Sequence, residues 1–350
     1  MNAGWKRLAP AAAIAALAVG VQLVLRAARL EQYLVQLTMA AWYGVAALGL
    51  CLFMGYAGQV SLGHAGFVAI GGYASAALAT LNLLPLAAAP AVQWLVRLGL
   101  AGSATDSFGA SVLRLSPWIG VVAGLVAAAL VAVLVGLPSL RLRGHYLAMA
   151  TLSLGIIVSR VILGTAALGQ ADGISSVPAL PLFAGLAVSG RRALRVQNYY
   201  VAWAAAVVAL ALILNLDRSR AGRALRAIHG DEEAASALGV GVGRYKLAAF
   251  VASALYASLA GSMLTHYNGG IGPGEASVMK SVRYVALVAA GGMGNAAGAL
   301  GVTVVLTFLS LRGAFGLYDD AVFAAILVAI MLFSPDGLFR GLRGLVGRPR

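Results

Sequence analysis

The chain has 350 residues, of which 61% are hydrophobic and only 10% are charged, and its mean hydropathy is +0.91. So few charged side chains cannot cover the surface of a protein in water, which excludes a soluble protein. The apolar runs are near-continuous and about 20 residues long, which suits helices that cross a bilayer and not the short alternating strands of a barrel. We predict an all-α, polytopic transmembrane helical bundle that forms a single domain over residues 1–350.

The net charge of +14 would suit a nucleic-acid partner if the arginines formed one patch. They fall instead in the short polar segments that flank the apolar runs, including Arg141, Arg143 and the ranges 218–226 and 340–350. Such residues anchor a membrane protein on its cytoplasmic side, so we expect no nucleic-acid partner. Cys51 is the only cysteine, which excludes an intrachain disulfide and favours a packing role.

The first apolar run, 8–25, follows Lys6 and Arg7, as the apolar core of a signal peptide would. It is followed by Arg26-Ala27-Ala28-Arg29 and not by a clean cleavage site with small residues. A retained first membrane helix is therefore favoured over a signal peptide.

Length and hydropathy predict about ten spans, with about eight to eleven possible. The expected spans are 8–25, 33–54, 58–80, 118–137, 145–168, 199–216, 245–267, 279–291, 295–311 and 318–333. The stretch 85–100 is interrupted by Pro90 and Arg97, so we interpret it as re-entrant or interfacial. An even count places both termini in the cytoplasm, but it leaves Arg26, Arg29 and the cluster 191–195 outside, against the usual charge bias.

The segment Gly55–Phe67 places Gln59, Ser61 and His64 among four glycines within an apolar region. A glycine inside a helix costs about 1 kcal/mol relative to alanine, so this cluster indicates a broken helix or closely approaching backbones. One hypothesis is that the three polar side chains line a path through the membrane. The alternative is close packing alone, with His64 bonded to a neighbouring carbonyl.

A polar loop over 217–244 interrupts the apolar pattern. Its first part, 218–229, alternates arginines with Leu225 and Ile228, as an amphipathic segment at a membrane surface would. Asp231 suits an N-cap and Gly239 suits the position that ends a helix, so we predict a helix over 232–238. A helix this short needs tertiary or partner contacts, because isolated helices below about 12–15 residues are marginal in water. The alternative is a surface helix that lies on lipid headgroups.

Several segments together resemble one family of membrane proteins. These are Gly55–Phe67, 140–148, 222–228, Gly291–Gly294 and the EAA-x-x-x-G motif at Glu233–Gly239. They are similar to the permeases of the branched-chain amino acid ABC importers, and their order and spacing resemble the LivM-type subunit over about residues 35–335. The resemblance implies an ABC importer permease fold with a cytoplasmic coupling loop at 217–244.

The resemblance also implies a function and partners. The function is that of a permease subunit that translocates branched-chain or other small amino acids delivered by a periplasmic binding protein. The implied partners are a homologous second permease, two ATP-binding subunits, the soluble binding protein and the lipid of a bacterial inner membrane. ATP hydrolysis would then take place on another chain, and no cofactor is expected. The residues implied to contact the ATPase are Arg223, Arg226, Asp231, Glu232, Glu233, Ala234, Ala235 and Gly239.

The implied translocation path adds Tyr146, Asp172 and Gly173 to Gln59, Ser61 and His64. The loop 168–174 keeps only part of the family's Thr-Gly-Gly-Pro-Asn-Gly-Ile pattern, and Ile156 stands where many relatives have a glutamate. Such departures leave urea, short amides and aromatic acids open as alternative solutes.

Charged residues near the third-last span are a further departure from relatives. Lys280 and Arg283 follow Glu275, and we interpret them as snorkelling at the interface or as a Glu275–Lys280 pair. Asp319 and Asp320 are expected to be solvated. His229 and His266 have no accompanying ligand cluster, so no metal site is expected.

Two other function classes fit less well. An ion-coupled secondary transporter would want a carboxylate buried in mid-span, whereas the 11 Asp and Glu residues lie in loops or at span ends. A membrane-embedded enzyme would need a nucleophile and base or a metal set, and none of the common catalytic motifs occurs.

Overall fold

The computed structural model describes residues 3–105, 109, 111–139, 145–183 and 185–333. The predicted anchors Arg141, Arg143 and those at 340–350 lie outside these residues. The helices are α1 (Ala3–Ala27), α2 (Tyr33–Cys51), α3 (His64–Thr80), α4 (Pro90–Arg97), α5 (Pro117–Ser139), α6 (His145–Gly164), α7 (Arg195–Arg218), α8 (Arg220–Gly230), α9 (Glu232–Ala237), α10 (Val242–Asn268), α11 (Val278–Gly291), α12 (Ala296–Leu311) and α13 (Asp319–Phe333). A π-helical turn, Leu52–Tyr56, extends α2, and 3₁₀ turns occupy Leu84–Leu86, Ala166–Leu168, Arg192–Leu194, Pro273–Ala276 and Gly316–Tyr318.

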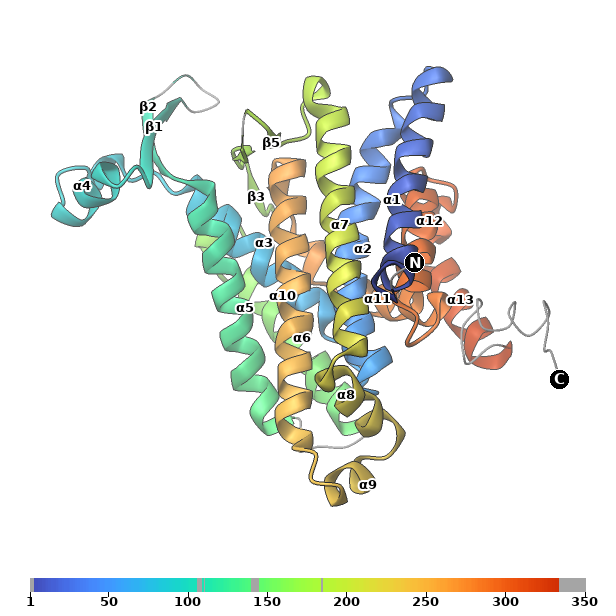
Figure 1. Ribbon diagram of the computed structural model, residues 1–350. Coiled ribbons are helices and arrows are strands. Elements are labelled where there is room, and N and C mark those ends of the chain that lie inside the picture. The colour runs from blue at the N-terminus through green and yellow to red at the C-terminus, as the bar shows by residue number, and fades with distance from the viewer. Residues whose placement is uncertain (1–2, 106–108, 110, 140–144, 184, 334–350) are drawn as a thin grey trace.

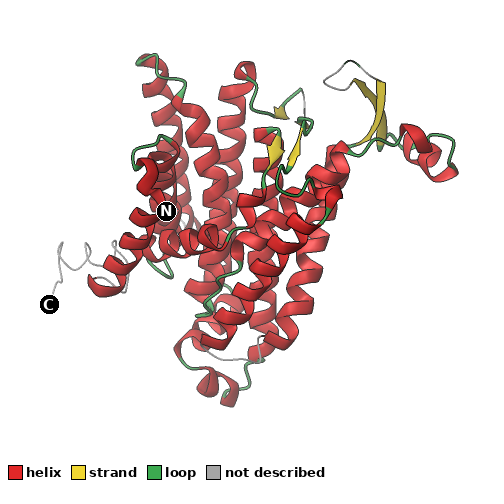
Figure 2. Ribbon diagram, turned by 180° about the vertical axis from the view of Figure 1, so that it is seen from behind, coloured by secondary structure: helices red, strands yellow, loops and turns green. Residues whose placement is uncertain are grey.

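Six short strands pair into three antiparallel two-stranded sheets. They are β1 (Ala101–Thr105) with β2 (Ser111–Leu115), β3 (Ile174–Ser175) with β6 (Gly270–Ile271), and β4 (Leu180–Pro181) with β5 (Ala187–Val188). Figure 1 shows the strands at one end of the helical bundle, here called the strand end, and α8 and α9 at the other. The β1–β2 hairpin and α4 extend sideways from the bundle, as Figure 2 also shows.

Each predicted span coincides with a helix, which confirms the prediction of a mostly helical, multi-span fold. Among the described residues, six helices are long and apolar enough to cross a membrane. The helices α3, α11, α12 and α13 have 17, 14, 16 and 15 residues and fall below that length. The expected count of about ten spans is therefore not reached by length and composition alone.

One predicted span needs correction, and the structure describes one stretch that the sequence left open. The span expected over 58–80 begins only at His64, because residues 57–63 leave the helical conformation after the π-helical turn. The stretch 85–100, interpreted as re-entrant or interfacial and not as a span, contains the short helix α4 and leads into the β1–β2 hairpin. None of the strands was predicted. β3, β4, β5 and β6 have two residues each, too few for a periodic signal in a sequence, and the five-residue strands β1 and β2 were also missed.

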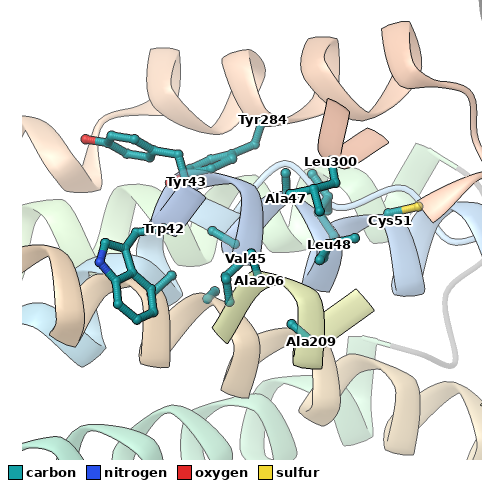
Figure 3. Packing of buried hydrophobic residues seen from close by; sticks show 14 of the residues in the cluster. Trp42, Tyr43, Val45, Ala47, Leu48, Cys51, Ala206, Ala209, Tyr284 and Leu300 are labelled. Carbon is teal, nitrogen blue, oxygen red and sulfur yellow. The ribbon is translucent and has the colours of Figure 1, made fainter. Parts of the chain in front are cut away.

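Helix α2 lies at the centre of the bundle. In its apolar window, 94% of the residues are buried, compared with 17% for α1, which lies at the periphery. Figure 3 shows Ala206 and Ala209 of α7, Leu300 of α12 and Tyr284 of α11 packed around α2. Cys51 is a free, fully buried thiol in this core, as the prediction of a packing role requires.

Glycines set how closely α3, α5 and α10 approach each other. A Cβ atom on Gly71 of α3 would collide with the Ser258 backbone of α10, and one on Gly261 of α10 would collide with the Val68 carbonyl of α3. On the other side of α3, a Cβ on Gly124 of α5 would lie 2.9 Å from the Gly71 carbonyl oxygen. In lipid, where the hydrophobic effect does not drive helices together, such close backbone contact supplies much of the attraction.

We predict that Gly261→Ala lowers the free energy of unfolding by about 1–3 kcal/mol, because the added methyl forces α10 away from α3. The measurement is unfolding in mixed micelles titrated with a denaturing detergent and followed by tryptophan fluorescence. The matched control is Gly301→Ala on α12, where no atom lies within 4 Å of the new Cβ. Equal unfolding midpoints for the two variants would contradict the close-packing account.

Candidate functional site

The loop between α7 and α10 begins with the amphipathic helix α8. Ser219 caps it, its hydroxyl oxygen accepting a hydrogen bond from the Gly222 amide at 3.1 Å. Leu225 and Ile228 are buried against the bundle, as the alternating pattern predicts. A Cβ on Gly222 would collide with the last carbonyls of α7, which accounts for the tight turn between the two helices.

The next helix, α9, begins at the predicted cap. The Asp231 carboxylate accepts hydrogen bonds from the amides of Glu233 at 2.8 Å and Ala234 at 3.0 Å. Gly239 follows the helix with a φ of +80°, a conformation that favours glycine and ends the helix. The predicted helix over 232–238 is thus confirmed, with Leu238 as its C-cap.

The predicted coupling residues divide between two faces of the loop. Ala235 is buried and Glu232 is half-buried, so both face the bundle. The exposed residues are Arg223, Arg226, Asp231, Glu233, Ala234 and Gly239. Leu238 joins them with an exposed fraction of 82%, which is unusual for a leucine. Next to it lies an open hollow of about 540 Å³, lined in part by Gly239 and Tyr245.

The inner face of α9 is held by a buried polar contact that joins three parts of the chain. Lys246, near the start of α10, is only 1% exposed and forms an ion pair with Glu232. The same carboxylate oxygen accepts a hydrogen bond from Gln59 Nε2 at 2.9 Å. Gln59 belongs to the non-helical residues 57–63 between α2 and α3, so α9 is connected to both α10 and this break.

Sequence reasoning did not find Lys246 or this use of Gln59. The only available signal was a lysine at the start of an expected span, where buried cations are costly without a partner. Gln59 was assigned to a translocation path, and 173 positions separate it from Glu232. Only the folded chain shows that the two meet.

The break at 57–63 is closely packed against its neighbours. The Leu62 amide donates a hydrogen bond to Thr151 Oγ1 of α6 at 3.0 Å, and His64 Nε2 lies 2.8 Å from the Ala46 carbonyl oxygen. His64 and Ser61 are buried, with exposed fractions of 1% and 2%. Both expected features, a broken helix and a histidine bonded to a carbonyl, are therefore present together.

The other candidate path residues lie apart from this break. Tyr146, at the start of α6, is 70% exposed. Asp172 is exposed in the loop before β3, and Gly173 packs against the Ile271 carbonyl of β6. The six candidates thus do not line a common pocket. Three lie at the break, Asp172 and Gly173 lie in the loop before β3, and Tyr146 is a single exposed side chain.

The charged residues around the start of α11 are paired. Lys280 Nζ lies 2.6 Å from a Glu275 carboxylate oxygen, which confirms the expected pair. Arg283 contacts Asp319 at 2.6 Å and Asp320 at 2.8 Å. The expectation that both aspartates are simply solvated is wrong for Asp319, because Arg283 and the Ser310 hydroxyl hold its carboxylate in a partly buried position.

Comparison with known proteins agrees with the helical architecture. A family profile described as branched-chain amino acid transport system / permease component matches residues 32–334. The high-affinity branched-chain amino acid transport system permease protein LivM of Salmonella typhimurium is 32% identical over 324 residues, covering 86% of this chain and 68% of the relative. LivM of Escherichia coli is 31% identical over 324 residues, which again cover 86% of this chain and 68% of the relative.

A second kind of permease matches part of the chain. LivH of Salmonella typhimurium is 33% identical over 148 residues, which cover 40% of this chain and 44% of the relative. No solved structure gives a significant match. The chain, with its several apolar helices, is a multi-pass membrane protein and belongs to the family of branched-chain amino acid transport system permeases.

Proposed function

We propose that the chain is a membrane-spanning permease subunit of a bacterial inner-membrane ABC importer and that its solute is a branched-chain or other small amino acid. The solute class is supported by what the relatives transport, as their names state. A homologous permease, two ATP-binding subunits and a soluble binding protein would complete the importer. The observation that carries the proposal is α9, a capped helix of 6 residues presented at one end of the bundle.

The exposed face of α9 suits docking of an ATP-binding subunit. A helix this short is stable only through its contacts: Asp231 caps its first turn, and Ala235 and Glu232 contact the bundle on the inner side. The outer side offers the Glu233 carboxylate and the exposed Leu238 beside an open hollow. An apolar side chain surrounded by polar groups is a common feature of a protein interface.

The inner contacts of α9 would transmit a movement of this helix to the membrane helices. A force applied to α9 would act through Glu232 on Lys246 of α10 and on Gln59 in the break between α2 and α3. Because α2 is central and α10 packs on α3, displacement of these elements would change the packing of the whole bundle. ATP binding could thereby switch the permease between outward-open and inward-open states.

We predict that Glu233→Arg combined with Gly239→Arg abolishes co-purification of the ATP-binding subunit, because it reverses a charge and places bulk on the exposed face of α9. The chain is expressed with its neighbouring genes, captured in detergent and probed for the ATPase. The matched control is Gln93→Arg on α4 with Gly99→Arg just after that helix. Gly99 also has a positive φ, +69°, and open space around it, but it lies at the strand end. Retention of the ATPase by the double variant would contradict docking at α9.

We predict that Lys246→Met destabilises the permease by up to about 3 kcal/mol, because it leaves the half-buried Glu232 carboxylate without its cation. Adding Glu232→Leu removes the unpaired charge and should restore most of the stability. ATP-driven uptake by the complete importer in liposomes should remain low in this double variant, since the polar connection is still absent. Wild-type uptake by the restored double variant would show that the ion pair serves stability alone.

A further inference from the structure

We propose that a cavity between α2, α11 and α12 binds the head group of a zwitterionic amino acid, with the ammonium on carboxylates and the carboxylate on hydroxyl and cationic groups. This inference rests on the proposed function and specifies where the permease itself contacts its solute. Its lining residues include Tyr43, Lys280, Arg283, Tyr284, Thr307 and Ser310.

The cavity adjoins a second, larger hollow. The inner cavity, about 50 Å³, lies beside Tyr43 and Tyr284. The centroids of these two rings are 6.3 Å apart, and Figure 3 shows the rings side by side. An open hollow of about 320 Å³ shares Lys280 and Arg283 with the inner cavity and is also lined by Glu275. The inner cavity fits a small polar head group, whereas the hollow leaves room for side chains of different shapes.

The inner wall carries one cation bonded to a carboxylate and a phenol. Lys280 Nζ donates to Glu275 at 2.6 Å and to the Tyr43 hydroxyl oxygen at 3.0 Å. The Tyr43 hydroxyl in turn donates to the same Glu275 oxygen at 3.2 Å. These contacts fix the position of one Glu275 oxygen and leave the other available.

The outer wall repeats this arrangement with an arginine. Arg283 bonds Asp319 and Asp320, and the Ser310 hydroxyl donates to Asp319 at 2.7 Å. The two cations and three carboxylates of the two walls leave a net charge of −1. A simple anion is disfavoured there, whereas a zwitterion presents its ammonium to the excess negative charge.

Three buried polar atoms, on residues that line the cavity and its adjoining hollow or bond their lining residues, have no hydrogen-bond partner within the described residues. They are Glu275 Oε2, Asp319 Oδ1 and the hydroxyl oxygen of Tyr284, a side chain only 3% exposed. Leaving a buried polar group unsatisfied costs about 1–3 kcal/mol, so three in one cluster indicate groups kept for a ligand. The two carboxylate oxygens accept from an ammonium, and the Tyr284 hydroxyl donates to a carboxylate.

The test is equilibrium binding of radiolabelled L-leucine to the chain and its partner permease in lipid nanodiscs without the binding protein. Competitors are 4-methylpentanoate, which lacks the ammonium, and 3-methylbutylamine, which lacks the carboxylate. Each half is expected to compete at least about tenfold more weakly than leucine, corresponding to the loss of about 1.4 kcal/mol. Competition by either half as strong as that by leucine would overturn recognition of both charges.

Two conservative variants test the assigned atoms. Tyr284→Phe and Glu275→Gln should each weaken leucine binding by about tenfold. The control Tyr256→Phe removes a hydroxyl that bonds the Ala209 carbonyl away from the cavity, and it should bind as the wild type does. Unchanged binding by both cavity variants, or no leucine binding by the wild type, would overturn the site.

Uptake by the complete wild-type importer separates this inference from the proposed function. Leucine uptake without measurable binding at the cavity would overturn only the site. Absence of ATP-dependent uptake of any small amino acid would overturn the proposed function as well.

Discussion

The contact among Glu232, Lys246 and Gln59 holds the short helix α9 against the membrane helices. A lysine that is 1% exposed is stable as a cation only when a carboxylate pairs with it, and here that carboxylate comes from the short helix α9. Gln59 completes the arrangement from the non-helical segment between α2 and α3. The requirement to neutralise one buried charge therefore fixes the position of α9 relative to the membrane helices.

Close helix packing would allow a movement at this contact to reach the other membrane helices. Gly71 and Gly261 bring the backbones of α3 and α10 together without intervening side chains, and α2 is enclosed by its neighbours. Tightly packed elements move as units, because a small shift at one contact cannot be absorbed by voids. The charged pairs of Lys280 and Arg283 belong to α11 and its contacts with α2, α12 and α13, whereas α9 lies at the end of the bundle opposite the strands. The proposed solute site and the proposed ATPase site thus lie on different elements, and α2, which lines the first and leads into the break at 57–63, connects them.

Local features of this fold were predictable from the sequence, and long-range contacts were not. The cap at Asp231, the stop at Gly239 and the buried side of α8 follow from residues only a few positions apart. The apolar runs also predicted where the helices lie. They did not predict how many of these helices are long enough to cross the bilayer alone. The bond between Gln59 and Glu232 spans 173 positions, and a single sequence carries no signal for it. The two-residue strands were missed for the same reason, since β3 finds its partner β6 only in the folded chain.

The most direct test of the account is amide hydrogen exchange in the complete importer, with and without a non-hydrolysable ATP analogue. The peptides of interest cover α9, the first turns of α10 and residues 57–63. If Glu232 transmits movement, exchange should change in all three segments together, and the change at 57–63 should disappear when Glu232 and Lys246 are both replaced by leucine. A nucleotide-dependent change confined to α9, with 57–63 and α10 unaffected, would contradict transmission through this contact.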